Sequence, residues 1–331
     1  MKTFVALACS LFCLLSFGQS RQTDVTVKKT LKLMGTRFEI TVVAPNEEIG
    51  YINIDEAVSE IERIEGIISS WDKDSETSLI NKNAGIKPVK VSRELLNLIE
   101  RSIKISEITD GAFDITYASM DEIWKFDGTM DKVPSEGKIK QSVSKVGYQK
   151  IQLDQENQTV YLPERGMCIG FGAIGKGYAA DRAKELLVSK DVKGGIINAS
   201  GDLTTWGTKV TGEKWLVGIA NPLSKDKVFS WLPIIESSVA TSGNYEKYII
   251  LDGKKYSHII DPRTGYPTRG ISSVSIFAKQ AELCDALATA VFIMGRDVGL
   301  HMINQIDGVE AVIVDAENKI QKSSGIMFDT N

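Results

Sequence analysis

Cysteine, proline and histidine are scarce in this sequence, whose 331 residues include four, eight and two of them. Two of the cysteines, Cys9 and Cys13, fall within the first 20 residues. Cys168 and Cys284 alone cannot build the disulfide framework of a small secreted protein. The shortage of proline excludes a collagen-like chain and a proline-rich one. A net charge of −4 excludes a large basic surface, so no nucleic acid is expected as a partner.

Long apolar runs are absent except at the N-terminus, which begins MKTFVALACSLFCLLSFGQS. One lysine precedes the apolar run, which is shorter than the roughly 20 residues that a membrane-spanning helix needs. This is the form of a secretory signal peptide, and its cysteines come too early for lipid attachment. We therefore predict a signal peptide over residues 1–20 and a single exported domain over residues 21–331. The expected location is the periplasm, with inner-membrane association and an uncleaved anchor left open.

The spacing of apolar residues predicts a mixture of strands and helices. Residues 25–43 alternate as strands around a turn at Met34-Gly35-Thr36, and steps of three and four predict a helix over 52–70. Other expected helices start at Ser92 or span 177–190, 281–294 and 297–305; expected strands lie near 149–162, 195–200, 204–210, 214–219, 247–251, 255–260 and 271–277, with a hairpin near 309–321. Strands and helices do not alternate strictly. We therefore predict an α+β fold, a largely antiparallel sheet flanked by helices.

A glycine-rich segment, Gly170-Phe171-Gly172-Ala173-Ile174-Gly175-Lys176, precedes one of the predicted helices. It matches the dinucleotide-binding GxGxxG pattern and most of the P-loop pattern, but Gly177 replaces the hydroxyl residue of a P-loop. Asp191 is the only acid near the distance that a Rossmann fold requires, and it precedes the next strand. A helix N-terminus after glycines still offers N–H groups to an anion. We expect Gly172 and Lys176 to contact a phosphate-bearing ligand, the alternative being a tight turn with a solvated lysine.

A second candidate site lies in the helix predicted over 281–294. Asp285 and Thr289 are one helical turn apart and therefore share a face. A carboxylate and a hydroxyl together can bind a hard cation such as Mg²⁺, which prefers oxygen ligands. A hydrogen bond between the two side chains is the alternative.

The third candidate is His258, one of the two histidines, at the end of a predicted strand before Asp261-Pro262-Arg263-Thr264-Gly265. Strand ends that feed loops are common places for catalytic groups. Histidine can serve as a general base near neutral pH, the alternative being a neutral bystander without a catalytic role. His301 lies in a helical segment and is expected to be a surface or packing residue.

Taken together, these segments resemble the FAD:protein FMN transferases of the ApbE family, over about residues 34–296. The matching blocks are Met34-Gly35-Thr36, Trp71 to Ser78 with Asn81, Asp110 to Thr116 with Trp124, Gly172 to Asp181, Asn198-Ala199-Ser200-Gly201-Asp202, Trp215 with Ile219 and Pro222, Thr241 to Tyr245, His258 to Gly265, and Asp285 to Thr289. The resemblance implies a single ApbE-like catalytic domain over residues 21–331.

The resemblance also implies roles for individual residues. FAD is expected against Met34, Trp71, Ala112, Phe113, Asp114, Lys176, His258 and Ile259. Mg²⁺ is expected on Asp285, Thr289 and the backbone carbonyl of Ala173. The implied reaction moves the FMN half of FAD to a Thr or Ser hydroxyl of an exported flavoprotein, such as a redox-pump subunit, and releases AMP. His258 would then be the catalytic base for the acceptor hydroxyl.

Two positions depart from the family pattern. Gly170 stands where the family usually has an acid, and Ala288 where some members have a second acid. Both departures remove oxygen ligands, so weaker metal or FAD binding is expected. Two other functions use the same phosphate chemistry: a metal-dependent FAD pyrophosphatase that yields FMN and AMP, and a passive FAD-binding protein.

Overall fold

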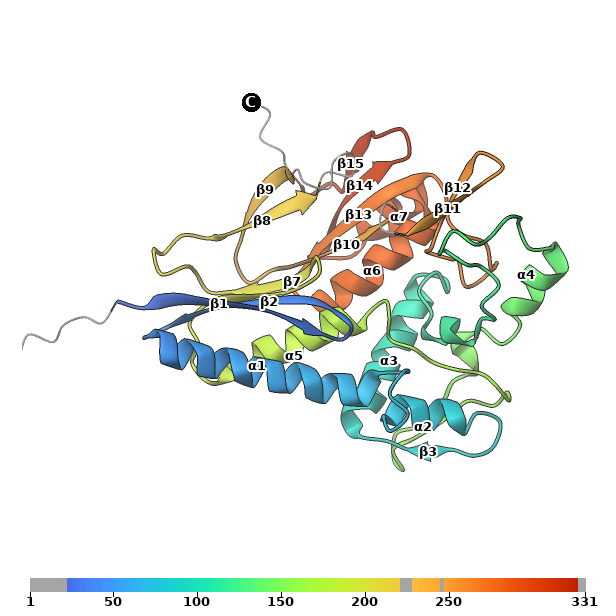
Figure 1. Cartoon of the computed structure of the whole chain (residues 1–331), viewed down its shortest axis with the longest axis horizontal. Coiled ribbons are helices and arrows are strands. Elements are labelled where there is room, and N and C mark those ends of the chain that lie inside the picture. Colours follow the sequence, from blue (N-terminus) through green and yellow to red (C-terminus); the bar gives the residue numbers. More distant parts are fainter. Residues whose placement is uncertain (1–22, 221–227, 245–246, 327–331) are drawn as a thin grey trace, which may run out of the picture.

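The computed structural model describes residues 23–220, 228–244 and 247–326 (Figure 1). The predicted signal peptide lies outside these residues. An eight-stranded sheet forms the centre of the fold, with the order β1-β2-β6-β7-β10-β13-β14-β15. Its strands are β1 (Val25–Leu33), β2 (Thr36–Ala44), β6 (Gly195–Ala199), β7 (Asp202–Trp206), β10 (Ser238–Gly243), β13 (Ile271–Ala278), β14 (Glu310–Asp315) and β15 (Ile320–Lys322). Every neighbouring pair is antiparallel, which confirms the predicted sheet.

Three long helices cover one face of this sheet. They are α1 (Glu47–Ile68), α5 (Gly175–Ser189) and α6 (Ala281–Met294). The first contacts β1 and β2, the second β6 and β7, and the third β10 and β13. Figure 1 shows the three helices side by side beneath the strands. The hairpin of β8 (Trp215–Ala220) and β9 (Val228–Ile234) lies toward the opposite face.

Helix α1 begins five residues earlier than its predicted start at residue 52. Asn46 is the N-cap, and its side chain accepts a hydrogen bond from the N–H of Ile49 at 2.9 Å. The first turn is acidic, so it carries little of the apolar periodicity that marks the rest of the helix. Ile54, Ile61 and Ile64 are completely buried and form its inner stripe.

The remaining elements complete the described part of the chain. They are α2 (Glu76–Lys82), α3 (Arg93–Ile108), α4 (Glu136–Ser142), α7 (Arg296–Ile303), the 3₁₀ turns η1 (Ile115–Ser119) and η2 (Tyr148–Lys150), a small sheet of β3 (Val89–Lys90), β5 (Thr159–Tyr161) and β4 (Gln152–Asp154), and the hairpin of β11 (Tyr248–Leu251) and β12 (Lys254–Ser257). Of the helices in the described ranges, none is long and apolar enough to cross a membrane.

A separate apolar cluster holds the β11–β12 hairpin. Trp124 stacks on Tyr256 with ring centroids 5.6 Å apart, and Ile139 of α4 packs with Ile249 from β11. The indole N–H of Trp124 donates to the carbonyl of Gly265 at 2.9 Å. This cluster therefore fixes the turn that follows β12, which carries His258.

Helix α6 is held at its N-terminus by a carboxylate from α5. Its own N-cap position, Gln280, makes no side-chain capping bond. Instead, the N–H groups of Ala281 and Glu282 donate to Asp181 at 3.0 and 2.9 Å. Because Asp181 is buried, this contact fixes the position of the helix that carries Asp285 and Thr289.

Asp181 should leave a measurable signature in the pH dependence of stability. Burial raises its pKa from 3.8 to about 6. The unfolded chain therefore loses this proton first, so the free energy of unfolding should fall as pH rises through this interval, by at most about 3 kcal/mol. Asp181→Asn should remove that slope in urea titrations between about pH 4 and pH 6. The exposed Asp191→Asn should keep it, and a slope that survives in Asp181→Asn would contradict the assignment.

Candidate functional site

One cavity of about 610 Å³ brings together residues from distant parts of the chain. Its wall is formed by η1 and the loop after it, the glycine-rich turn before α5, strand β10, helix α6 and the turn after β12. Among the lining residues are Trp71, Ala112, Phe113, Asp114, Gly172, Ala173, Lys176, His258, Ile259, Asp285 and Thr289. All the residues that we predicted for FAD and metal therefore line this cavity, with the exception of Met34.

Met34 lies behind the glycine-rich turn and does not line the cavity. It has a positive φ of 49° in the β1–β2 turn, and its N–H donates to the carboxylate of Glu65 at 3.0 Å. Its methyl group is 3.8 Å from where a Cβ on Gly175 would lie. In this structure Met34 supports the turn from behind, so the expected contact with FAD is not seen in the cavity lining.

The glycine-rich turn is shaped by close packing. A Cβ on Gly177 would lie 2.2 Å from the carbonyl oxygen of Ala281, where α5 and α6 meet. A Cβ on Gly175 would lie 2.9 Å from Ile68, and one on Gly172 would lie 2.5 Å from the hydroxyl of Tyr117. These glycines therefore serve close approach rather than a left-handed backbone.

The antiparallel sheet excludes the two nucleotide-binding patterns considered from the sequence. Rossmann and P-loop sites lie at the carboxyl ends of parallel strands. Within the described part of the chain, every pairing of named strands is antiparallel, and Asp191 lies in the turn after α5. The Rossmann interpretation of the GxGxxG match is therefore wrong, although the segment does open a helix at the cavity.

Lys176 lies between two buried carboxylates. Its ammonium nitrogen is 2.9 Å from Asp202 and 3.5 Å from Asp285. Burial alone would lower the pKa of Lys176, but the charges of Asp285 and Asp202 outweigh it and raise this pKa above its ordinary value. Burial and the charge of Asp285 also raise the pKa of Asp202. The lysine is therefore a fixed positive charge at the cavity wall.

The oxygen atoms around Asp285 fit a hard cation. Asp202 and Asp285 place carboxyl oxygens beside Lys176 at the cavity wall, and oxygen atoms of this kind are the ligands that a hard cation prefers. Thr289 and the turn residue Ala173 line the same cavity and can add a hydroxyl and a carbonyl oxygen. No cluster of three or more His, Cys, Asp and Glu side chains occurs in the described ranges, so the donor set would have to include such oxygens.

The side chains of Asp285 and Thr289 share no hydrogen bond in the described part of the chain. Asp285 accepts the N–H of Gly177 at 3.2 Å, while the Thr289 hydroxyl pairs with that of Ser242 at 3.3 Å. The local hydrogen bond that we considered as an alternative is therefore not the arrangement seen. Both side chains remain directed at the cavity.

His258 enters the cavity from the turn after β12. Its backbone N–H and its Nδ1 both lie near the carbonyl oxygen of Lys247, at 3.1 and 3.0 Å. When Nδ1 carries the proton and donates to this carbonyl, Nε2 is the basic nitrogen of the ring. The hydrogen bond thus favours the tautomer that a general base requires.

Trp71, Phe113 and Asp114 were predicted to contact FAD, and they differ in how accessible their side chains are to a ligand in the cavity. Trp71 is 96% exposed, whereas Phe113 is 2% exposed and belongs mainly to the core. Asp114 accepts bonds from the N–H and hydroxyl of Thr116 and from the N–H of Tyr148. The Asp114 carboxylate therefore holds η1 in place. Because Phe113 is buried and Trp71 is exposed, Trp71 is the better candidate for stacking on a ligand ring.

Two residues that line the cavity, Asp202 and Tyr117, were not predicted from the sequence as site residues. Asp202 is the last residue of Asn198-Ala199-Ser200-Gly201-Asp202, one of the segments that resemble the ApbE family. Its contact with Lys176, however, depends on the pairing of β6 and β7. Tyr117 lies in η1, and its hydroxyl would lie 2.5 Å from a Cβ on Gly172. No spacing or motif in the sequence marks Tyr117.

Gly172→Val should weaken FAD binding by more than about tenfold, because the new side chain meets the hydroxyl of Tyr117 and must displace the turn. A fluorescence titration of FAD measures the effect. Gly66→Val is the matched control, because a Cβ on Gly66 meets no atom within 4 Å. Unchanged affinity in Gly172→Val, in a variant that melts normally, would show that the turn does not contact FAD.

Comparison with known proteins places this chain and its fold among flavin transferases. The family model described as "ApbE family" matches residues 34–313. An FAD:protein FMN transferase of Klebsiella pneumoniae is 31% identical over 80% of this chain and 82% of its own length. One of Treponema pallidum is 29% identical over 89% of this chain and 86% of its own.

A solved structure agrees with these sequence matches. The ApbE protein of Thermotoga maritima superposes with a TM-score of 0.82 at 32% identity, covering 91% of this chain and 97% of that one. The chain is thus an α+β enzyme of the flavin-transferase class. It belongs to the ApbE family, as the resemblance in its sequence predicted.

Proposed function

We propose that this chain transfers the FMN half of FAD to a Thr or Ser hydroxyl of an exported acceptor protein, with Mg²⁺ as cofactor and AMP as the second product. The observation that carries the proposal is one cavity that combines Lys176, two buried carboxylates and His258. The curated relatives in Klebsiella pneumoniae and Treponema pallidum are named FAD:protein FMN transferase, which supports the transfer of FMN from FAD to a protein.

The reaction requires a bond to form and another to break at phosphorus. The acceptor oxygen bonds to the phosphorus of the FMN half, and the pyrophosphate P–O bond on that phosphorus breaks, so that AMP leaves. Such a transfer depends mainly on positioning and on stabilisation of negative charge. Lys176 supplies a positive charge, and N–H groups at the start of α5 can face the phosphates. Asp285, Thr289 and the Ala173 carbonyl would hold Mg²⁺, which when bound supplies further charge neutralisation.

An acceptor hydroxyl is a weak nucleophile at neutral pH, so it needs a base. His258 would take its proton at Nε2, while the carbonyl of Lys247 holds the opposite side of the ring. A positioned base of this kind contributes roughly 10²- to 10⁴-fold to a rate. Trp71, exposed at the rim, is available to stack on a flavin or adenine ring.

Incubation of the purified protein with FAD, Mg²⁺ and a candidate acceptor domain tests the proposal. Intact-mass measurement should show the acceptor heavier by one covalent FMN, with the increment on a Thr or Ser. Free FMN and AMP without labelled acceptor would identify an FAD pyrophosphatase instead. Unchanged FAD would identify a passive FAD-binding protein.

Export is a separate part of the proposal. It rests on the apolar N-terminus that begins at Met1 and ends near Gln19. Expression of the full chain in a bacterium, followed by fractionation and N-terminal sequencing, should find a shortened protein in the periplasm. A full-length protein in the cytoplasm would contradict it.

A further inference from the structure

The β11–β12 hairpin is a two-stranded sheet that none of the other described strands extends. Its inner side chains, Ile249 and Leu251, are buried in the cluster around Trp124. On the other side Tyr248 and Ile250 are 44% and 63% exposed. Figure 1 shows the hairpin projecting beside α4, apart from the eight-stranded sheet.

The hydrogen-bond register of the hairpin leaves one edge unpaired among the residues that the structure describes. Antiparallel strands alternate between hydrogen-bonded and non-hydrogen-bonded pairs. The N–H of His258 donates to Lys247, so the next hydrogen-bonded pairs are Ile249 with Tyr256 and Leu251 with Lys254. Tyr248 and Ile250 therefore point their N–H and C=O groups away from β12, as on an edge strand that can accept another strand.

The open edge of β11 lies close in the fold to the part of the cavity that His258 lines. Strand β12 ends at Ser257, and the next three residues, His258 to Ile260, line the cavity. His258 pairs with Lys247 at the open end of the hairpin, beside the start of β11. A strand laid along β11 toward this end would therefore finish beside Lys247, whose carbonyl holds both the backbone N–H and Nδ1 of His258.

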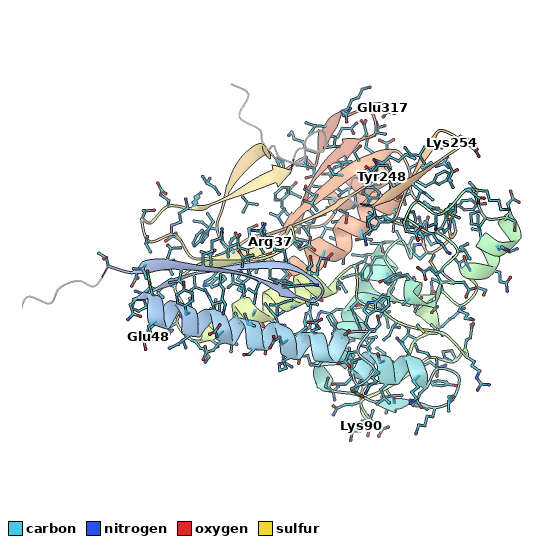
Figure 2. The ribbon with its side chains drawn as sticks, viewed as in Figure 1. Arg37, Glu48, Lys90, Tyr248, Lys254 and Glu317 are labelled. Carbon is cyan, nitrogen blue, oxygen red and sulfur yellow. The ribbon has the colours of Figure 1, made fainter. Side chains whose placement is uncertain are left out.

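The charge of the hairpin differs from that of the whole chain. Residues 247–257 include Lys247, Lys254 and Lys255 against the single acid Asp252, whereas the chain carries a net charge of −4. The ammonium of Lys255 lies 4.3 Å from the centre of the Tyr248 ring. Figure 2 shows Lys254 at the tip of the hairpin and Tyr248 nearer its base. This surface therefore suits an extended segment of acidic and apolar residues.

We propose that β11 is the docking edge for the acceptor protein, which adds an extended acidic segment to it as a new strand and so delivers its hydroxyl to His258. The inference rests on the proposed transfer reaction and specifies the partner surface for it. Backbone hydrogen bonds to Tyr248 and Ile250 would give affinity, and the exposed side chains would give selectivity.

The test uses a short synthetic peptide in which one threonine is flanked by aspartate and valine residues. A second peptide with lysine in place of aspartate is its control. In hydrogen exchange, the acidic peptide should slow the amides of Tyr248 and Ile250 in the full-length protein. FMN transfer to the acidic peptide should exceed transfer to the basic one by at least about tenfold in kcat/KM.

Two variants separate docking from chemistry. Ile250→Asp should repel the acidic segment, and Ile250→Pro should remove an outward N–H without breaking a hairpin hydrogen bond. Each should raise the KM for the acidic peptide by at least about tenfold while FAD affinity and the release of FMN to water stay unchanged. Ile86→Asp is the matched control, because Ile86 is 60% exposed and does not line the cavity.

Each remaining outcome overturns the docking assignment or the reaction. Equal peptide transfer by Ile250→Asp and Ile86→Asp would overturn docking at β11 but leave the transferase function standing. Amide protection at β11 without FMN transfer would overturn the function but leave the docking edge. Protection caused by a second copy of the chain, seen as a dimer, or by anionic vesicles would assign the edge to another occupant.

Discussion

Asp285→Ala should abolish Mg²⁺-dependent turnover, with a loss of at least about 10³-fold at limiting Mg²⁺, the rate equivalent of several kcal/mol. Asp285 contacts Lys176 and the N–H of Gly177 and lines the cavity beside Thr289. Its removal deletes the carboxylate that we place on the metal. Initial rates of FMN transfer across a Mg²⁺ titration measure the effect.

Two further variants separate loss of the metal from loss of the fold. Asp285→Ala leaves the Gly177 N–H without its acceptor, which costs about 1–3 kcal/mol of stability. Asp285→Asn can keep that hydrogen bond and should still lose turnover. Asp297→Ala, whose side chain is 79% exposed on α7, should behave as the wild type. Full activity of Asp285→Ala at limiting Mg²⁺ would overturn the proposed metal site.

His258→Ala should lower FMN transfer by two or more orders of magnitude while FAD affinity stays near normal. A base acts on the acceptor hydroxyl and contributes little to the binding of FAD. Single-turnover transfer measured beside an FAD titration distinguishes the two quantities. Added imidazole should restore part of the lost rate, because a diffusing base can enter the space left by the side chain.

His301→Ala is the control for His258, because His301 is exposed on α7 and does not line the cavity. Neither transfer nor FAD binding should change in this variant. Parallel losses of binding and transfer in His258→Ala would make His258 an FAD-positioning residue. Unchanged transfer would mean that the proton of the hydroxyl leaves by another route.

Local patterns were enough to place several elements of the fold. Helix α6 spans 281–294 as predicted, because its apolar residues are nearly continuous and Gly295 ends it with a positive φ of 82°. The strands β1 and β2 around Gly35 also follow from alternation and a turn. The spacing of Asp285 and Thr289 depends only on helical geometry, so the sequence placed both on one face.

Strand β10 shows where local patterns failed. Its sequence, SVATSG, is small and partly polar and has no clear alternation, yet it lies between β7 and β13 near the middle of the sheet. Helix α6 packs against it, and Ser238 to Ala240 are buried. Small side chains suit this close packing, but packing against a distant helix leaves no periodic signal in the strand itself.

The sequence by itself determined the antiparallel α+β class, the glycine-rich turn before α5, the face shared by Asp285 and Thr289, and the strand-end position of His258. Each depends on residues close together in the chain. Only the tertiary structure decided that Asp202 and Asp285 share Lys176, that Tyr117 meets Gly172, and that Met34 lies outside the cavity. Those contacts join residues brought together by strand pairing and helix packing, and neither is encoded in local spacing.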